Sequence, residues 1–435
     1  MWDRLKSQSR QKRFFKLISL EEALSRIEQS TLNRLPEAEA VETVKCLGRV
    51  LAEDIVAEVN LPDHNFAAMD GFAVNTKDVK DASERNPVRL TVKGELFPPD
   101  HPTDAAIING ETMYVACGAP IPRGADAVLK VENARQETDS VIVVQMPLEP
   151  NRNICLIGED VKKQDLVLPK NRLIRPQDIG LLVALNLETV KVVRKPRVAV
   201  ISVGEELTQP FKSAPNKIVN NNAYIIASLA EAFKAESLII GIARDTVEDI
   251  SQKIAAAAPQ ADIIVTIAGC SVGARDFVPD AVEKLGGDHG GIIFHGVALS
   301  AGKVSGFGLV QGKPLMMLPG HVGSTVAAFC LLVLPLLNRQ LGLGFTDRLP
   351  VVRCVLDEPV RPGKPGVELV LPMKMYSRGG EYHAVPMRKP LSVLKNLADA
   401  NGFAMIHAGV SLDAGEGVDV KVYSGLEFYS VESSE

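Results

Sequence analysis

Residues 197 to 340 alternate short apolar runs with amphipathic segments, and no other feature constrains the fold of this chain as strongly. The segment 263–267 is apolar on both faces, which is typical of a strand buried inside a parallel sheet. Strand–helix alternation at this spacing predicts a doubly wound α/β domain whose parallel sheet is covered by helices on both sides. The predicted strands are 198–202, 238–242, 263–267, 292–299, 306–310 and 314–318, and the predicted helices are 223–233, 247–258, 277–285 and 323–340.

Glycine-rich or polar segments follow several strands of this domain. In an open parallel sheet the ligand lies beyond the carboxyl ends of the strands, so these segments are expected to meet at one site. Glycines let the backbone approach a ligand closely, and a serine that caps a helix leaves backbone N–H groups facing an anion. The sequence therefore predicts one small-molecule site for an anionic ligand around Gly204, Gly273 and Gly320. The segments are 202–206, 268–276, 300–303 and 318–324, with Ser271 and Ser324 as candidate caps and Lys303 as a positive charge.

Three carboxylates near these segments form a candidate Mg²⁺ site. Proteins usually bind this hard cation through one or two carboxylates together with substrate oxygens. Glu206, Asp245 and Asp276 are placed to supply them. By contrast, the residues alone predict a structural role for His321, because no carboxylate or cysteine adjoins it. Cys117 and Cys270 are expected to be small apolar fillers.

The rest of the chain predicts three further domains, since 435 residues are too many for one compact core. Residues 17–59 and 151–195 are expected to form a discontinuous linker domain of mixed structure, with a helix over 17–27 that Ser19 caps. Short strands between turn signals predict a β insertion domain over 60–150. Residues 196–342 are the α/β domain, and 343–435 are expected to form a small C-terminal β-barrel. The fold class is thus α/β plus β, multidomain.

Composition and spacing exclude several classes of function. A formal net charge of −5 and an aromatic content of 5% argue against binding to nucleic acid or anionic membranes. The longest apolar run, 326–337, is too short to span a bilayer. The six cysteines lack C-x-x-C spacing and the seven histidines lack H-E-x-x-H spacing, which favours a reducing cytoplasm over a zinc module or a disulfide scaffold. No signal peptide is expected, because the basic N-terminus leads directly into Glu21 and Glu22.

Several motifs, in the right order, resemble the MoeA family of molybdopterin molybdenumtransferases, which includes the gephyrin E domain. The resemblance runs from about residue 17 to the C-terminus. Residues 65–74, Asn-Phe-Ala-Ala-Met-Asp-Gly-Phe-Ala-Val, resemble the family's N-S-A-M-D-G-Y-A-V. The other matching segments are 118–122 with 125–128 (T-G-A-P-x-P…A-D-A-V), 158–160 (R-x-x-G-E-D), 271–277 (S-G-G-V-S-x-G…D-[FY]), 318–320 (L-P-G-N-P), and 400–402 with Ser392 (S…A-N-G).

The resemblance implies an elongated homodimer of four domains, one of them a MogA-like α/β domain. Its site would lie between the α/β domain of one subunit and the β insertion of the other. The implied reaction is Mg²⁺-dependent insertion of molybdate into adenylylated molybdopterin with release of AMP. Molybdopterin adenylyltransferase and molybdoenzymes would be its partners.

The resemblance also assigns roles to single residues. Asp70, Asp160, Glu206 and Lys303 would be catalytic. Asp245 and Asp276 would hold the metal. The positions assigned to the ligand are Cys117, Gly204, Asn222, Gly269, Ser271, Gly273, Pro319, Gly320, His321, Ser324 and Ser392.

Departures from the family pattern concentrate at this site. Two of them remove cations, because Ser300 stands where the family has lysine and Val367 where it has arginine. Each charge-assisted hydrogen bond lost in this way is worth about 1.5–3 kcal/mol. The other departures are Cys117 for threonine, Val219-Asn220 for tyrosine-aspartate, Ile267-Ala268 for serine-glycine, Val304 for proline, and His321-Val322 for asparagine-proline.

Three hypotheses follow. The first is an insertase with a divergent pocket, in which His321 and Arg275 supply the missing charge. The second is a non-catalytic or repurposed relative that binds a molybdopterin or nucleotide without turnover. The third is a different Mg²⁺-dependent enzyme acting on a phosphorylated nucleotide through Asp245 and Asp276. The retained carboxylates favour the first.

Overall fold

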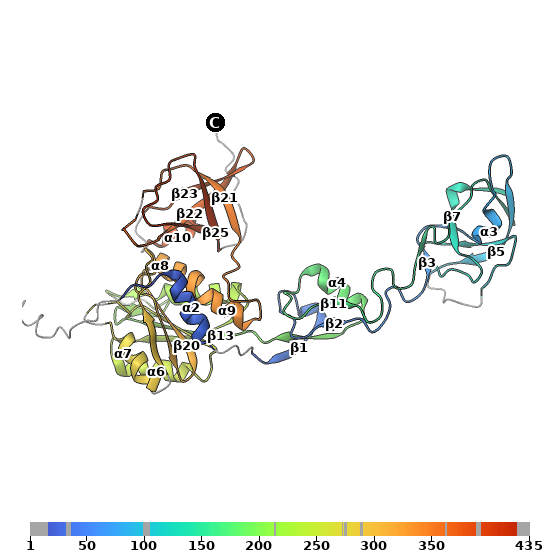
Figure 1. Cartoon of the computed structure of the whole chain (residues 1–435). Coiled ribbons are helices and arrows are strands. Elements are labelled where there is room, and N and C mark those ends of the chain that lie inside the picture. Colours follow the sequence, from blue (N-terminus) through green and yellow to red (C-terminus); the bar gives the residue numbers. More distant parts are fainter. Residues whose placement is uncertain are drawn as a thin grey trace, which may run out of the picture. The chain divides into compact units, whose positions relative to one another are not determined.

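The chain divides into two compact units (Figure 1). The computed structural model describes residues 16–31, 36–98, 105–212, 215–271, 273, 276–287, 290–361, 363–388 and 393–423. Unit 1 comprises Met1–Glu39, Gly48–Val50 and Val192–Glu435, and unit 2 comprises Ala40–Leu47 and Leu51–Lys191. The chain passes between the units through β1 (Ala38–Glu42) and β12 (Thr189–Val193), which pair with each other.

A six-stranded sheet in the order β16-β13-β17-β20-β19-β18 forms the centre of unit 1. β16, β13, β17 and β20 are parallel, but β19 is antiparallel to both of its neighbours. The prediction of an all-parallel sheet is therefore wrong at this edge. A two-residue turn at Gln311 and Gly312 joins β19 to β20, and a parallel pair would need a long crossover. The strands are β13 (Arg197–Val203), β16 (Glu236–Ala243), β17 (Ile263–Ile267), β18 (Gly291–His295), β19 (Gly306–Val310) and β20 (Lys313–Leu318).

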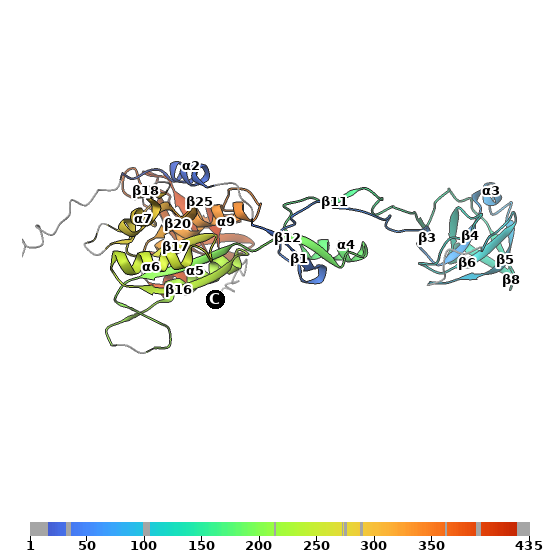
Figure 2. The same cartoon turned by 90° about the horizontal axis from the view of Figure 1, so that it is seen from below.

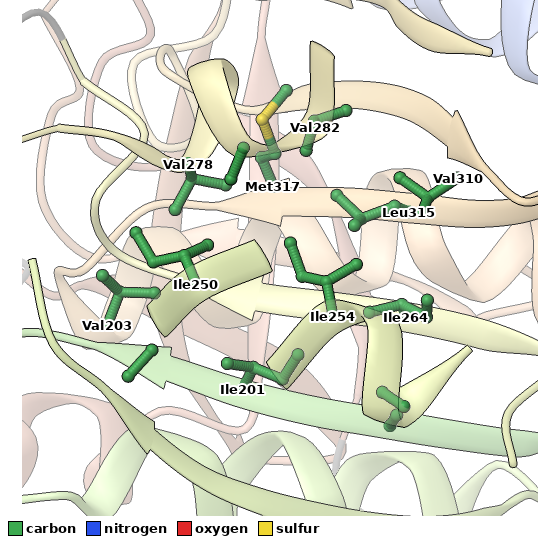
Figure 3. Close-up of a cluster of buried hydrophobic side chains, with 14 of the residues drawn as sticks. Ile201, Val203, Ile250, Ile254, Ile264, Val278, Val282, Val310, Leu315 and Met317 are labelled. Atoms are coloured by element: carbon green, nitrogen blue, oxygen red, sulfur yellow. The ribbon is translucent and has the colours of Figure 1, made fainter. Parts of the chain in front are cut away.

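Helices cover both faces of this sheet, as the sequence predicts: they lie on its two sides in Figure 1, and Figure 2 views the sheet face-on from β16 to β18. α6 (Val247–Ala257) and α7 (Val278–Gly286) pack on one face through a fully buried cluster. Figure 3 shows Ile250 and Ile254 of α6 against Ile201 and Ile264 of the sheet. α5 (Asn221–Ala232) packs on β13 and β16 and also contacts α8.

One long helix over Val322–Gln340 completes the core of unit 1. It consists of α8 (Val322–Ala328), a π-helical turn (Phe329–Val333) and α9 (Leu334–Gln340). Its length and hydropathy would suffice to cross a membrane, but 94% of its most apolar window is buried inside the fold. The helix is therefore a buried core helix of unit 1.

α2 (Leu20–Ser30) also lies in unit 1, although the sequence analysis grouped residues 17–59 with the linker. Ser19 caps it as predicted, accepting the N–H of Glu22 at 3.0 Å. Arg26 donates to the carbonyl of Ile293 in β18, and Arg339 of α9 donates to the carbonyl of Glu28. The helix is amphipathic, so its apolar face needs cover, and the strands and helices of unit 1 provide it.

A closed five-stranded barrel follows the α/β domain, which confirms the predicted C-terminal barrel. Its strand order is β21-β23-β22-β24-β25, and a short helix, α10 (Leu394–Asp399), precedes β24. The strands are β21 (Val351–Leu356), β22 (Leu369–Arg378), β23 (Glu381–Pro386), β24 (Gly402–Ile406) and β25 (Gly417–Val422).

Unit 2 contains a six-stranded sheet in the order β7-β4-β6-β5-β9-β8 and two small strand pairs, β10-β3 and β11-β2. The segment predicted to be all-β contains, within its described residues, only the one-turn helix α3 (Thr76–Val79) besides strands, turns and a 3₁₀ turn. α4 (Pro176–Ala184) begins at Pro176, a position where proline is well tolerated. The strands are β2 (Ile55–Val56), β3 (Phe66–Ala67), β4 (Gly71–Val74), β5 (Val88–Leu96), β6 (Glu111–Val115), β7 (Ala127–Lys130), β8 (Ala134–Thr138), β9 (Val141–Val144), β10 (Ile154–Cys155) and β11 (Leu166–Leu168).

Candidate functional site

A cavity of about 410 Å³ lies in unit 1 at the carboxyl ends of β13, β17 and β20. This is the edge at which an open α/β sheet binds ligands, and the volume is typical of a small-molecule site. The two-residue strands β14 (Leu207–Thr208) and β15 (Ile218–Val219) and the first residue of α10 also border it. The lining residues are Ser202, Val203, Glu206, Leu207, Ile218, Val219, Asn220, Asn221, Asn222, Ile267, Ala268, Gly320, His321, Val322 and Leu394.

Four of the residues assigned to the site from sequence line this cavity: Glu206, Asn222, Gly320 and His321. Gly204 lies directly behind Glu206, with a positive φ of 151°. A Cβ at Gly204 would come within 2.5 Å of Glu206 Oε1, so this glycine makes room for the carboxylate. The remaining predicted residues that the structure describes do not line the cavity, and Arg275 and Ser392 lie outside the described residues.

The helices α5 and α8 both begin at the cavity. Their N-cap residues, Asn220 and His321, make no side-chain capping hydrogen bond in the part of the chain that the structure describes. Uncapped N–H groups and the positive end of the helix dipole favour an anion. The first turn of α8 is held instead by Thr325, whose hydroxyl donates to the carbonyls of Pro319 and His321 at 2.7 and 2.9 Å.

The predicted serine caps are wrong. Ser324 lies inside α8, two residues past its start, and is buried. Ser271 lies well before α7, whose N-cap is Phe277. The predicted helix starts at 277 and 323 are right within one residue, but the capping position depends on backbone conformation and not on the nearest serine.

Two asparagines at the start of α5 form the polar wall of the cavity. Ser202 Oγ donates to Asn220 Oδ1 at 2.7 Å, and Asn222 Nδ2 donates to the carbonyl of Gly320 at 2.7 Å. The other ends of the two amides, Asn220 Nδ2 and Asn222 Oδ1, are buried and have no hydrogen-bond partner among the described residues. Buried polar groups are rarely left without a partner, so these atoms mark a place where a ligand can supply one.

The sequence analysis included Ser202 in a site segment and Asn220 among the departures at the site but gave neither residue a role, and it missed Asn221. The available signal was the run of three asparagines, 220–222, placed between a strand and a helix. Asparagine is a poor helix former, and a run of it at a helix start indicates local side-chain hydrogen bonding.

The glycine-rich segment after β17 is held by packing. Cys270 is fully buried, and burial raises the pKa of its thiol to about 12, as expected for an apolar filler. A Cβ at Gly269 would come within 2.9 Å of Val203 and 3.0 Å of Val278, so this glycine serves packing. His295 Nε2 makes a hydrogen bond of 2.6 Å with the carbonyl of Cys270, and burial lowers the pKa of His295, so the ring anchors the segment as a neutral imidazole.

Two of the three predicted metal carboxylates, Asp245 and Asp276, each accept a backbone N–H. Asp245 Oδ2 accepts the N–H of Glu205 at 3.2 Å, and Asp276 Oδ2 accepts the N–H of Gly273 at 2.5 Å. Among the described residues, no three histidine, cysteine, aspartate or glutamate side chains gather into a group that could hold a metal alone. The carboxylate oxygens of Asp245 and Asp276 suit Mg²⁺ only if oxygen atoms of a bound ligand complete its coordination.

The segment 298–303 attaches the α/β domain to the barrel. Ser300 Oγ accepts the N–H of Val370 at 2.9 Å, and the N–H of Ser300 donates to the carbonyl of Glu368 at 2.8 Å. Ser300 therefore serves to join the two domains. Lys303 is exposed and does not line the cavity.

A second group of predicted residues lies in unit 2. Asp70 Oδ1 accepts the N–H of Cys117 at 2.8 Å, and Cys117 Sγ donates to the carbonyl of Ala68 at 3.3 Å. Cys117 is exposed, because it lies on the turn after β6, so the prediction that it fills an apolar space is wrong. Burial raises the pKa of Cys155, and the charges of Glu159, Cys117 and Asp160 raise it further. Cys155 was not predicted from sequence.

Three family models match consecutive parts of the chain. Residues 18–186 match the MoeA N-terminal region (domain I and II). Residues 199–339 match a probable molybdopterin binding domain. Residues 353–423 match the MoeA C-terminal region (domain IV).

Curated proteins and solved structures agree with these matches. The molybdopterin molybdenumtransferase of Haemophilus influenzae is 31% identical, over 75% of this chain and 78% of its own length. Molybdopterin molybdenumtransferase 2 of Mycobacterium tuberculosis is 34% identical, over 70% and 75%. A crystal structure of the molybdopterin biosynthesis MoeA protein from Pyrococcus horikosii superposes with a TM-score of 0.82 at 32% identity, covering 94% of this chain and all of that one.

Proposed function

Because this chain belongs to the MoeA family and acts in molybdenum cofactor biosynthesis, we propose that it is a molybdopterin molybdenumtransferase whose substrate binds in the cavity of unit 1. The proposed reaction inserts molybdate into adenylylated molybdopterin and releases AMP. The observation that carries the proposal is the 410 Å³ cavity at the strand ends, with two uncapped helix N-termini beside it. That arrangement suits the phosphate of an adenylate.

Mg²⁺ is part of this proposal. Asp245 and Asp276 are the residues that would hold it, with substrate oxygens completing the set. When bound, the ion would neutralise phosphate and oxyanion charge. The residues of this chain position the ligand: the N-termini of α5 and α8 bind its anionic group, and Glu206 and the asparagine wall orient its polar edges.

We also propose that the working form is a homodimer in which Asp70, Cys117 and Asp160 of the partner subunit complete the site. Unit 2 carries many exposed large apolar side chains, among them Val44, Leu47, Val56, Ile157, Leu166 and Val183. In the proposed dimer part of this exposed apolar surface would be covered by the partner subunit. Analytical ultracentrifugation at micromolar concentration should give a dimer mass, and a monomer at all concentrations would contradict this part.

The decisive experiment is a turnover assay with the full chain. Adenylylated molybdopterin, Mg²⁺ and molybdate are added, and AMP release is measured. We expect release that depends on both ions, and an Asp276→Asn variant that loses it by about a hundredfold or more, since it removes a metal-binding charge. Glu248 is exposed on α6, so the control variant Glu248→Gln should release AMP as fast as the unmodified chain. Binding of substrate with no AMP release would reject the proposal.

A specific observation supports a second candidate, a relative that binds the ligand without turnover. Ser300 and Val367 replace the two family cations, and Ser300 is engaged with the barrel. This candidate predicts tight binding of adenylylated molybdopterin in calorimetry together with no AMP release, so the same assay decides between the two.

A further inference from the structure

Two segments of the α/β domain carry charged residues that were assigned to the site from sequence. Residues 268–276 follow β17 and carry Asp276, and residues 300–305 lie between β18 and β19 and carry Lys303. A carboxylate and a cation can act on one ligand only if their spacing is held, because small displacements of reacting groups are costly in rate. The contacts that hold the two segments therefore matter for the proposed reaction.

β18 ends at His295, and the ring of this residue contacts both segments. His295 Nε2 lies 2.6 Å from the carbonyl oxygen of Cys270. Since a carbonyl oxygen only accepts, this nitrogen carries a proton and donates it. Burial lowers the pKa of the histidine, whereas hydrogen bonds with the backbone of Cys270 and of Val304 raise it. One side chain thus joins the segment after β17 to the segment before β19.

The backbone directly after His295 holds the second segment. The N–H of Gly296 donates to the carbonyl of Ser305 at 2.8 Å, and the N–H of Val297 donates to the carbonyl of Lys303 at 3.0 Å. The end of β18 therefore binds the first segment through a side chain and the second through two successive backbone N–H groups.

The contact with the first segment lies at the base of the loop that carries Asp276. The N–H of Val278 donates to the carbonyl of Gly269 at 3.0 Å and closes this loop. Cys270, the next residue, donates its thiol to the carbonyl of Leu318 at 3.3 Å, and its own carbonyl is the group that His295 binds. A shift of the ring would therefore move the base of the loop.

A glycine leaves room for the ring in this position. His295 is paired with Gly306 of β19, and a Cβ at Gly306 would come within 3.1 Å of His295 Cδ2. The ring lies over the place where any other residue would carry its side chain. Its orientation is thus fixed by Gly306 on one side and by the carbonyl of Cys270 on the other.

We propose that His295 is a positioning residue of the transferase reaction, which fixes the spacing between Asp276 and Lys303 by joining the two segments that carry them. This inference rests on the proposed function and adds to it a residue that acts only through the segments it holds. The sequence analysis gave His295 no role.

The first test measures hydrogen exchange in the full chain without ligand, by mass spectrometry of fragments that contain Val278 or Ser305. His295→Leu removes the donor, so both fragments should exchange about tenfold faster or more. His295→Gln places an amide N–H near the position of Nε2, so exchange should stay within about threefold of the unmodified chain. Faster exchange in only one of the fragments, or no recovery in His295→Gln, would overturn the proposal.

The second test separates kcat from KM in the assay of AMP release. A misplaced carboxylate and lysine lower the rate of the bound complex, so His295→Leu should lower kcat about tenfold or more. KM for adenylylated molybdopterin should stay within about threefold, because the cavity lining is intact. His295→Gln should recover most of kcat. A raised KM with unchanged kcat, or equal losses in both variants, would contradict a positioning role.

The matched control is a second histidine of unit 1. His383 in β23 of the barrel is buried, and its Nδ1 makes a hydrogen bond of 2.8 Å with Asp357 Oδ1. His383→Leu should leave exchange of the Val278 and Ser305 fragments unchanged. If it accelerated them as His295→Leu does, general loosening of the unit would explain the effect and the proposal would fail.

The two proposals fail separately. If the unmodified chain releases no AMP, the proposed function is rejected, and hydrogen exchange still decides whether His295 joins the two segments. If AMP is released but His295→Leu changes neither exchange nor kcat, the proposed function stands and this inference is wrong.

Discussion

At the scale of single residues, burial decides the role of a side chain in this protein more than the residue type does. Cys270 and Cys117 were given the same role from sequence, yet one is fully buried and the other lies exposed on a turn. Asn222 was assigned to the ligand through the family resemblance, but Asn220 could not be recognised in this way, because its importance depends on an amide nitrogen that folding leaves without a partner among the described residues. Motif matching finds residues at the right position in the chain, but satisfaction of hydrogen bonds is known only once the surroundings are folded.

The thiols should differ sharply in reactivity. With a disulfide-exchange reagent at pH 7.5, Cys117 should react first, because it is exposed. Cys155 should follow more slowly, because burial and its acidic neighbours raise its pKa. Cys270 and Cys330 should react only on unfolding, since burial raises the pKa of each to about 12. Cys117→Ser should abolish the fast phase, and a fast phase that persists in this variant would contradict the assignment.

Asp178 at the start of α4 should make unit 2 sensitive to acid. Burial alone would raise its pKa, but hydrogen bonds from Arg172 and Arg175 outweigh burial and hold the pKa well below the ordinary value. Because the folded-state pKa is depressed, the stabilisation is present above the ordinary aspartate pKa and is lost as pH falls below it.

Asp178→Asn should therefore lower the free energy of unfolding of unit 2 by about 2 kcal/mol at pH 7, a value reduced because both arginines are partly exposed. The difference from the unmodified chain should shrink toward pH 3 in denaturant titrations. Asp139→Asn, on an exposed turn, is the matched control and should change nothing. A destabilisation independent of pH would show that the charge is not its source.

At the scale of elements, hydrophobic periodicity predicted the α/β domain well. The predicted strand 263–267 coincides with β17, and the helix predicted over 247–258 is α6 within one residue. Strand direction was not predictable in the same way, since a buried strand has the same apolar pattern in either direction. β19 is antiparallel because its link to β20 is short.

The strand predicted over 292–299 ends at His295 for a related reason. Gly296 has φ of 106°, and the residues beyond it form bridges to other segments, Val297 to Ile18 and Leu299 to Glu368. The apolar pattern continues past the strand because those residues are buried against different partners. Hydrophobic periodicity predicts which residues are buried, but it does not predict which element they pack against.

Two glycines of unit 2 should respond oppositely to alanine. A Cβ at Gly71 in β4 would lie 2.1 Å from the carbonyl oxygen of Leu129 in β7, so Gly71→Ala must separate two paired strands. We expect a loss of about 3 kcal/mol or more in the free energy of unfolding. Gly180 in α4 has open space around it, so Gly180→Ala should stabilise the same unit by about 0.5–1 kcal/mol. Chemical denaturation of both variants measures the contrast, and equal effects would refute it.

At the scale of the whole molecule, the two units have separate cores. The buried clusters around Leu90 and Val115 belong to unit 2, and the sheet and barrel clusters belong to unit 1. The sequence predicted four domains from changes of pattern. The structure confirms the α/β domain and the C-terminal barrel, but α2 lies in unit 1 and not in the predicted linker domain, and strand and turn signals carry no information on which domains share a cooperative unit.

Calorimetry should therefore resolve two unfolding transitions. Gly71→Ala should lower the midpoint of one transition and leave the other unchanged, because the substitution affects only the core of unit 2. If both midpoints fell together, the units would unfold cooperatively, and the division inferred from internal packing would not describe the energetics.

Helix Val322–Gln340 has a consequence for how this protein is made. By length and hydropathy alone it could cross a lipid bilayer, and inside the fold 94% of its most apolar window is buried. Every strand of the sheet that it covers, from β13 to β20, precedes it in the chain. During translation the sheet that receives the helix is therefore synthesised first, but α10 and barrel residues such as Phe403 also pack around it and follow it in the chain, so its burial is complete only after the C-terminal domain has been made.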